Sequence, residues 1–339
     1  MLSRVAERIY WLARYVERAE NTARLINVNT LMLLDLPRGV PLGWEALIEM
    51  TGASEAFAEH YNEPVERNVV RFLVADQRNP GSLISSLKGA RENARTIRDI
   101  IPREAWERIN ELYLQAVAEL PGSLARGRRY EALMSVIDAS QQLTGILAGA
   151  MLHDAGYDFL RLGRNLERAD MISRIIDVRT ADTLPSEFAG QAPLRSLRWM
   201  SLLRSLSAYQ AYRQQVQTAV RRDDVLEFLF KSAQFPRAVR HCVGEVSAAV
   251  ERLPRSEEAH ERCLSLIRQI ERARVRRFDD AAVHRFVDRV QKSLGQVHDL
   301  VGQTWFLVAP PPTKRRRRTC GPWGLFRTRF GVRGSDQSR

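Results

Sequence analysis

The sequence predicts an all-α protein built from two tandem repeats, and two observations support this. Apolar residues recur at the three- and four-residue spacing of amphipathic helices, with no convincing alternation of the kind that strands show. Two segments 150 residues apart, 10–28 and 160–178, also align without a gap and share an unusual polar pattern. We therefore expect a pseudo-symmetric helical bundle over residues 1–308, with repeats of about 1–156 and 157–308.

Capping residues and helix breakers set the expected elements of the first half. Ser3 can cap the first helix, and Pro37 ends it. Asn79 and Pro80 have the pattern of a cap followed by proline at the first helical position, and Pro102 is expected to open the next helix similarly. The expected helices are 3–36, 44–60, 65–77, 80–99, 102–121 and 129–156, with a loop over 37–43.

The second half is expected to replay this order. Its first helix runs to about residue 180, and a loop passes through Pro185, Gly190 and Pro193. A second pair of similar stretches, 69–73 and 225–229, lies at an offset of 156 and supports duplication of the whole unit. The remaining expected helices are 195–221, 223–233, 236–252, 256–275 and 279–307.

Composition is that of a soluble globular protein, with 45% hydrophobic and 27% charged residues. No apolar run reaches the roughly 18 residues that a membrane span needs, and the N-terminus enters a charged helical pattern without an apolar signal region. We therefore expect a cytoplasmic protein. The cysteines, Cys242, Cys263 and Cys320, are odd in number and lack CxxC spacing, which predicts reduced, buried thiols.

Most of the positive charge lies in the last 31 residues. Residues 309–339 hold nine basic residues against one acid, which places +8 of the net +12 there and leaves +4 for residues 1–308. Three consecutive prolines and a run of five basic residues predict that this tail is disordered. A nucleic-acid partner is therefore expected only through the tail.

The duplicated segments share the pattern Arg-x-x-Glu-Arg-Ala-acid-x-x-x-Arg. On a helix, residues three, four and seven apart share a face, so the first arginine, the glutamate and the second arginine form one stripe. The last acid and the last arginine form a favourable i,i+4 pair. Small residues at Ala13 and Gly163 would let another helix approach closely. The candidate ligand-binding residues are Arg14, Glu17, Arg18, Glu20 and Arg24 in one copy, and Arg164, Glu167, Arg168, Asp170 and Arg174 in the other.

Three interpretations of these residues remain open. The two helices can face each other, so that the arginines of each neutralise the glutamate of the other in a buried structural network. They can instead form a pocket for a carboxylate, a peptide C-terminus or a phosphate, where Glu17 or Glu167 could hold an amine or act as a general base. Paired carboxylates at i,i+3 also suit metal, but no histidine is near and arginines crowd the acids, so no metal site and no cofactor are predicted.

Other candidate sites are weaker. The sequence contains no HExxH motif, no glycine-rich phosphate loop and no G-x-S-x-G elbow. Tyr209, Tyr212 and Arg213, with the segment 235–237, could line a groove, although aromatic residues at helical spacing more often belong to a core.

The stretches 8–20 and 162–170 resemble the bacterial Alpha-E family, an all-helical domain named for its ER motif, over about residues 1–308. Its ER residues correspond here to Glu17-Arg18 and Glu167-Arg168. Members are typically encoded beside, or fused to, circularly permuted ATP-grasp ligases, often with a transglutaminase-like protease nearby. The resemblance therefore implies a role in forming and cleaving peptide or amide bonds, with those two enzymes as partners. The family's own activity is not established.

The expected function is that of an accessory or binding protein, which acts with the ligase or its peptidic substrate through the paired ER helices. One alternative is an enzyme that hydrolyses or transfers an amide with Glu17 or Glu167 as general base. Another is a purely architectural bundle. Burial of the two glutamates distinguishes these alternatives, because a base must reach its substrate.

Overall fold

The computed structural model describes residues 2–35, 43–181, 192–217 and 219–307. Within these ranges the chain forms fourteen α-helices and no β-strand, which confirms the predicted all-α class. Three predicted segments lie largely outside the described residues. They are the loop 37–43 except residue 43, most of the loop through Pro185 and Gly190, and the basic tail.

The helices of the first half are α1 (Ser3–Asp35), α2 (Glu45–Met50), α3 (Ser54–Ala58), α4 (Glu66–Val74), α5 (Leu83–Thr96), α6 (Arg103–Glu119) and α7 (Arg126–Ala150). Those of the second half are α8 (Ala155–Ala181), α9 (Ala192–Ser205), α10 (Tyr209–Gln215), α11 (Arg222–Lys231), α12 (Val239–Glu251), α13 (Glu257–Arg272) and α14 (Asp280–Val301). Short 3₁₀ turns at Leu120–Gly122 and Val275–Arg277 and a π-helical turn at Gly302–Phe306 complete the described structure.

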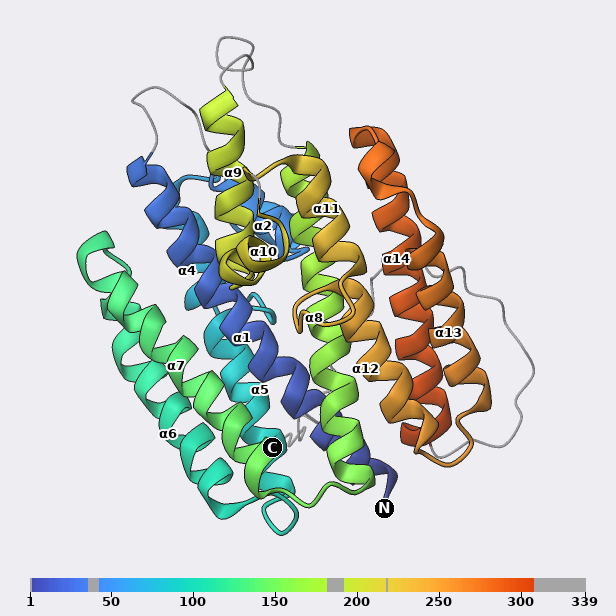
Figure 1. Ribbon diagram of the computed structural model, residues 1–339. Helices are drawn as coiled ribbons and strands as arrows, with labels where there is room; N and C mark the ends of the chain where they lie inside the picture. The colour runs from blue at the N-terminus through green and yellow to red at the C-terminus, as the bar shows by residue number, and fades with distance from the viewer. Residues whose placement is uncertain (1, 36–42, 182–191, 218, 308–339) are drawn as a thin grey trace, which may run out of the picture. The chain divides into compact units, whose positions relative to one another are not determined.

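The long helices α1 and α8 lie side by side at the centre of the bundle (Figure 1). Helices α5 and α7 pack against α1, and α6 packs against both of them. In the same order, α12 and α14 pack against α8, and α13 packs against both of those. Helix α2 also contacts α8, and α9 contacts α1, so each half reaches the central helix of the other. The buried apolar residues of both halves form one hydrophobic core.

Two predicted helices are wrong because each is broken in two. The predicted helix 44–60 divides into α2 and α3 at Gly52, whose φ of 67° lies in the left-handed region. The predicted helix 195–221 divides into α9 and α10 at Ser207, whose φ is 51°. Leu206 and Ala208 on either side of that break are both buried. The spacing of apolar residues therefore predicts which side chains are buried, but it does not predict whether they belong to one unbroken helix.

The predicted helix start at Pro80 is also wrong. Helix α5 begins three residues later, with Ser82 as its N-cap, because the Ser82 hydroxyl accepts a hydrogen bond from the Ser85 amide at 3.3 Å. Asn79 closes a local turn instead, where its Oδ1 accepts from the Gly81 amide at 2.9 Å. Asparagine readily forms such turns, and the turn competes with helix initiation. Pro102 likewise stands one residue before its helix, at the N-cap of α6.

The remaining boundaries differ from the predictions by a few residues. Helix α7 starts three residues earlier than predicted and ends six residues earlier, at Ala150. The last predicted helix, 279–307, corresponds to α14 and the π-helical turn that follows it directly. This turn continues the helix by five residues.

Close contact between α1 and α8 depends on a glycine. A Cβ atom on Gly163 would overlap the carbonyl oxygen of Tyr10 and lie 3.2 Å from the Cβ of Ala13. The small residues that the sequence places at 13 and 163 therefore face each other in this interface. A larger side chain at position 163 would push the two central helices apart.

We expect Gly163→Ala to lower the free energy of unfolding by about 1–3 kcal/mol, because the added methyl group overpacks a rigid helix contact. Urea denaturation followed by circular dichroism measures the change. Gly145→Ala in α7 is the matched control, since a Cβ there meets nothing within 4 Å. The control should stabilise the protein by about 0.5–1 kcal/mol through helix propensity. Equal effects of the two substitutions would contradict the packing argument.

Candidate functional site

The predicted ER residues of α1 and α8 meet in the interface between these two helices. Arg14, Glu17 and Arg18 share one face of α1, and α8 lies along that face with Glu167 and Arg168. We use the name ER network for the connected polar residues of this interface, which are Arg14, Glu17, Arg18, Glu20, Asn21, Glu167, Arg168 and Arg237.

Two arginines of α1 bind Glu167 of α8. Arg14 donates from Nε to Oε2 at 2.7 Å. Arg18 donates from Nε to Oε1 at 2.6 Å and from Nη2 to Oε2 at 3.0 Å. Both carboxylate oxygens therefore accept charge-assisted hydrogen bonds from the opposite helix.

The reciprocal pairing holds Glu17 of α1. Arg168 of α8 donates from Nε to Oε1 at 2.8 Å and from Nη2 to Oε2 at 2.7 Å, which is a bidentate fork. Asn21 donates to Oε1 from the next turn of α1 at 3.2 Å. Each glutamate of the ER motif is thus neutralised by arginine from the other helix, as the structural-network interpretation predicts.

Arg237, just before α12, is a member of the network that the repeat pattern did not identify. Its Nη1 donates to Glu17 Oε1 and to Asn21 Oδ1, both at 2.9 Å, and its Nη2 donates to Glu20 Oε1 at 2.7 Å. At the offset of 156 the corresponding residue of the first half is Gly81, so no duplication marks this position. The segment 235–237 drew attention only as a possible groove lining.

The other predicted residues occupy less central places. Arg24 donates to Glu20 at 2.5 Å and Arg174 donates to Asp170 at 3.1 Å, each as the predicted i,i+4 pair. Arg164, the counterpart of Arg14, makes no ion pair within the described part of the chain. Burial, and then the neighbouring Arg168, lower the pKa of Arg164.

The aromatic candidates belong to the core. Tyr212 is fully buried and its ring meets Phe228 edge to face. Phe235 stacks on the same Phe228 with ring centroids 5.0 Å apart. These contacts support the core interpretation of the aromatic residues over a groove lining.

Both glutamates are sealed from solvent, with exposed fractions of 2% for Glu17 and 3% for Glu167. Burial alone would raise the pKa of Glu17, but Arg168 and Arg237 outweigh it and hold that pKa well below its ordinary value. For Glu167, burial is likewise outweighed, and Arg18 and Arg14 lower the pKa to about 2. Carboxylates that are always ionised and doubly paired are weak proton acceptors at neutral pH.

A histidine–tyrosine pair extends the network at one end. The Tyr10 hydroxyl lies 2.7 Å from Nδ1 of His298, and Arg14 Nη1 donates to that hydroxyl at 3.1 Å. Arg14 Nη1 also lies 3.2 Å from Nδ1, and because arginine can only donate, Nδ1 is an acceptor and the Tyr10 hydroxyl donates to it. Burial, followed by the charge of Arg14, lowers the pKa of His298 to about 3. His298 is therefore neutral at pH 7.

The family model of an α-helical domain with a conserved ER motif matches residues 1–306. The chain belongs to the Alpha-E family. The two ER motifs of this Alpha-E chain are the glutamates and arginines that pair across α1 and α8.

Curated relatives of this Alpha-E chain include an uncharacterised protein of Mycobacterium bovis and uncharacterised proteins of two strains of Mycobacterium tuberculosis. Each is 26% identical over 271 residues, which cover 75% of this chain but 30% of the relative. The chain thus spans less than a third of the length of these relatives. A search of the solved structures gives no significant match.

Other site classes receive no support from the described residues. Among them, no group of three or more histidine, cysteine, aspartate or glutamate side chains is placed to hold a metal ion. No helix within the described ranges is long and apolar enough to cross a membrane. Cys242 and Cys263 are buried free thiols, as predicted, and burial raises the pKa of each to about 12. Cys320 lies outside the described residues.

We expect Glu167→Gln to lower the free energy of unfolding by about 3–5 kcal/mol at pH 7, because it leaves Arg14 and Arg18 buried without a counter-charge. Urea denaturation measures the loss. Glu107→Gln is the matched control, since Glu107 pairs with Arg103 on an exposed face of α6 and its loss should cost less than about 1 kcal/mol.

This loss should depend on pH in a defined direction. The pKa of Glu167 falls from its ordinary 4.5 to about 2 on folding, so the stabilisation is complete above pH 4.5 and disappears as pH falls toward 2. The stability difference between the wild type and Glu167→Gln should therefore shrink across this window. A difference that stays constant would contradict the depressed pKa.

His298 should produce a second pH dependence. The folded state resists protonation of His298 while the unfolded state accepts the proton below pH 6.5, so the wild type loses stability as pH falls from 6.5 toward 3. One such proton contributes up to about 1.4 kcal/mol per pH unit. His298→Gln, which retains an acceptor for Tyr10, should show a flatter profile in urea denaturation between pH 7 and pH 4. Parallel profiles would refute a buried neutral histidine.

Proposed function

We propose that this Alpha-E chain is a non-catalytic accessory protein of a system that forms and cleaves peptide or amide bonds, and that it works with an ATP-grasp ligase. The main support for a non-catalytic protein is the burial of Glu17 and Glu167. Both carboxylate oxygens of each glutamate are paired with arginine. These groups have neither the access nor the free lone pairs that a general base needs.

In this proposal the ER motif is the structural centre of two tandem repeats. Its support is the matching order of packing in the two halves, where α5, α6 and α7 surround α1 as α12, α13 and α14 surround α8. A duplicated helical unit buries its central helix against its copy, and the reciprocal charges fix the register of the two. Binding to partners would then fall to the outer helices.

Family membership and the length of the relatives support the proposed partnership with a ligase. The matched segment is 30% of each mycobacterial protein, which supports an Alpha-E unit that also occurs as a module of larger chains. A circularly permuted ATP-grasp ligase, and a transglutaminase-like protease, are the partners that the family resemblance implies. A cytoplasmic location is part of the same proposal, because ATP-grasp ligases consume ATP.

Co-purification with a circularly permuted ATP-grasp ligase from the same organism tests the partnership. We expect the two proteins to co-elute in size-exclusion chromatography and the chain to change the rate of ADP release by the ligase. An ATP-grasp ligase from an unrelated system is the control and should do neither. Separate elution together with unchanged turnover would refute the accessory role.

The same glutamates test the enzymatic alternative. Under the proposal, Glu17→Gln lowers the melting temperature, because Arg168 loses its counter-charge and Arg237 keeps only Glu20. Loss of an amide-hydrolysing activity with a melting temperature equal to that of the wild type would instead establish Glu17 as a general base.

A further inference from the structure

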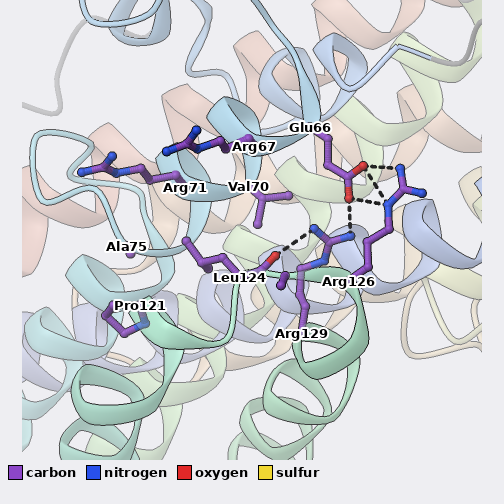
Figure 2. A pocket seen from close by; sticks show the side chains of 10 residues that line it. Glu66, Arg67, Val70, Arg71, Ala75, Pro121, Leu124, Arg126 and Arg129 are labelled. Carbon is purple, nitrogen blue, oxygen red and sulfur yellow. Dashed lines mark hydrogen bonds and ion pairs between the residues drawn. The ribbon is translucent and has the colours of Figure 1, made fainter.

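A groove of about 790 Å³ lies between α4 and the segment that joins α6 to α7, on the surface of the first half (Figure 2). Its volume falls in the range of small-ligand sites. The lining consists of five charged side chains above an apolar floor, and comprises Glu66, Arg67, Val70, Arg71, Ala75, Pro121, Leu124, Ala125, Arg126 and Arg129. None of these residues belongs to the ER network.

The one acid of the groove is already occupied. Arg126 donates from Nε to both oxygens of Glu66, at 2.8 and 2.9 Å, and also pairs with it through Nη2. The buried Arg129 donates to Glu66 Oε1 at 2.8 Å. Four arginines and one glutamate leave the lining with a net charge of +3.

Two of the arginines remain available. Arg67 and Arg71 are exposed and lie one turn apart on α4, and Figure 2 shows them projecting together away from the Glu66 cluster. Neither side chain forms an ion pair or hydrogen bond with a residue that the structure describes. The acid that follows Arg71 in the chain, Asp76, is held instead by Arg78 and by the Tyr61 hydroxyl, at 2.6 and 2.7 Å.

The second half shows that the fold does not require these arginines. At the offset of 156, Asp223 and Glu227 of α11 replace Arg67 and Arg71. These acids have partners, because Arg222 lies 3.2 Å from Asp223 and Lys231 lies 3.6 Å from Glu227. Packing at these two positions therefore accepts either sign of charge, and among the described residues the acids of α11 have partners whereas the arginines of α4 do not.

The two halves also keep a bridge between equivalent helices with the charges reversed. Glu66 of α4 pairs with Arg126 at the start of α7. Arg222 of α11 pairs with Asp280 at the start of α14, at 2.8 Å. The salt bridge thus has a structural role in both halves. Arg67 and Arg71, which lie beside it in the first half and have no side-chain partner among the described residues, are the groups that a ligand could bind.

We infer that this groove binds an acidic peptide, with carboxylates on Arg67 and Arg71 and an apolar side chain over Pro121 and Leu124. Guanidinium forks match carboxylates in bidentate geometry, and an apolar floor stabilises a ligand with aliphatic groups. The inference rests on the proposed function only for the choice of a peptide among carboxylate ligands.

The test uses acetyl-Ala-Leu-Glu with a free C-terminus, titrated into the full chain by isothermal calorimetry. Arg67→Asp with Arg71→Glu gives the first half the charges of the second, so folding should be retained. We expect at least about tenfold weaker peptide binding, because charge-assisted hydrogen bonds are lost. The matched control is Arg268→Asp with Arg272→Glu, two exposed arginines one turn apart on α13, which should bind like the wild type.

Two further probes distinguish the ligand class. Acetyl-Ala-Leu-Gln-amide, which lacks both carboxylates, should bind at least about tenfold more weakly than the acidic peptide. Equal binding of the two peptides, an equal loss in the α13 control, or inorganic phosphate binding as tightly as the peptide would each overturn the inference. The assay contains no ligase, so its failure leaves the co-elution result intact and the two proposals can fail separately.

Discussion

The structure depends on two carboxylates, Glu17 and Glu167, that are ionised inside a helix interface. An uncompensated charge there would cost several kcal/mol, so each glutamate requires cations within hydrogen-bond reach. The arginines of the opposite helix meet this requirement, and they can do so only if α1 and α8 lie close together in one register. The glycine at position 163 permits that approach, because a Cβ there would overlap the Tyr10 carbonyl oxygen.

The network is reciprocal but not symmetric, because Arg14 pairs with Glu167 while its counterpart Arg164 makes no ion pair with a described residue. Glu167 is held by Arg14 and Arg18, whereas Glu17 is held by Arg168 together with Arg237 from the segment just before α12. A duplicated helix pair is therefore joined to α12 through charge as well as apolar packing. A buried centre whose carboxylates are all paired is suited to scaffolding, and in our proposal ligands bind at surfaces such as the Arg67–Arg71 groove.

The sequence predicted helices correctly where buried apolar residues at helical spacing belong to one helix. It failed where the helix breaks but the residues on both sides of the break remain buried. Leu206 and Ala208 keep the helical spacing across a residue with positive φ, so no pattern of side chains could show the break at Ser207. Asn79 followed by Pro80 had the pattern of a helix start, but the asparagine side chain closed a turn and Ser82 became the cap. Local competition between two hydrogen-bonded conformations decided that boundary.

The sequence by itself determined the all-α class, the duplicated ER helices and the residue types that would pair, because helical spacing and repeated charge are local properties. Only the tertiary structure decided that the pairs are sealed, and that Arg237 and His298 complete the network from 220 and 284 residues away from Glu17 and Arg14. It also brought α4 beside the start of α7, where a basic groove forms. Burial and long-range contact depend on how helices pack together, and no single helix encodes that arrangement.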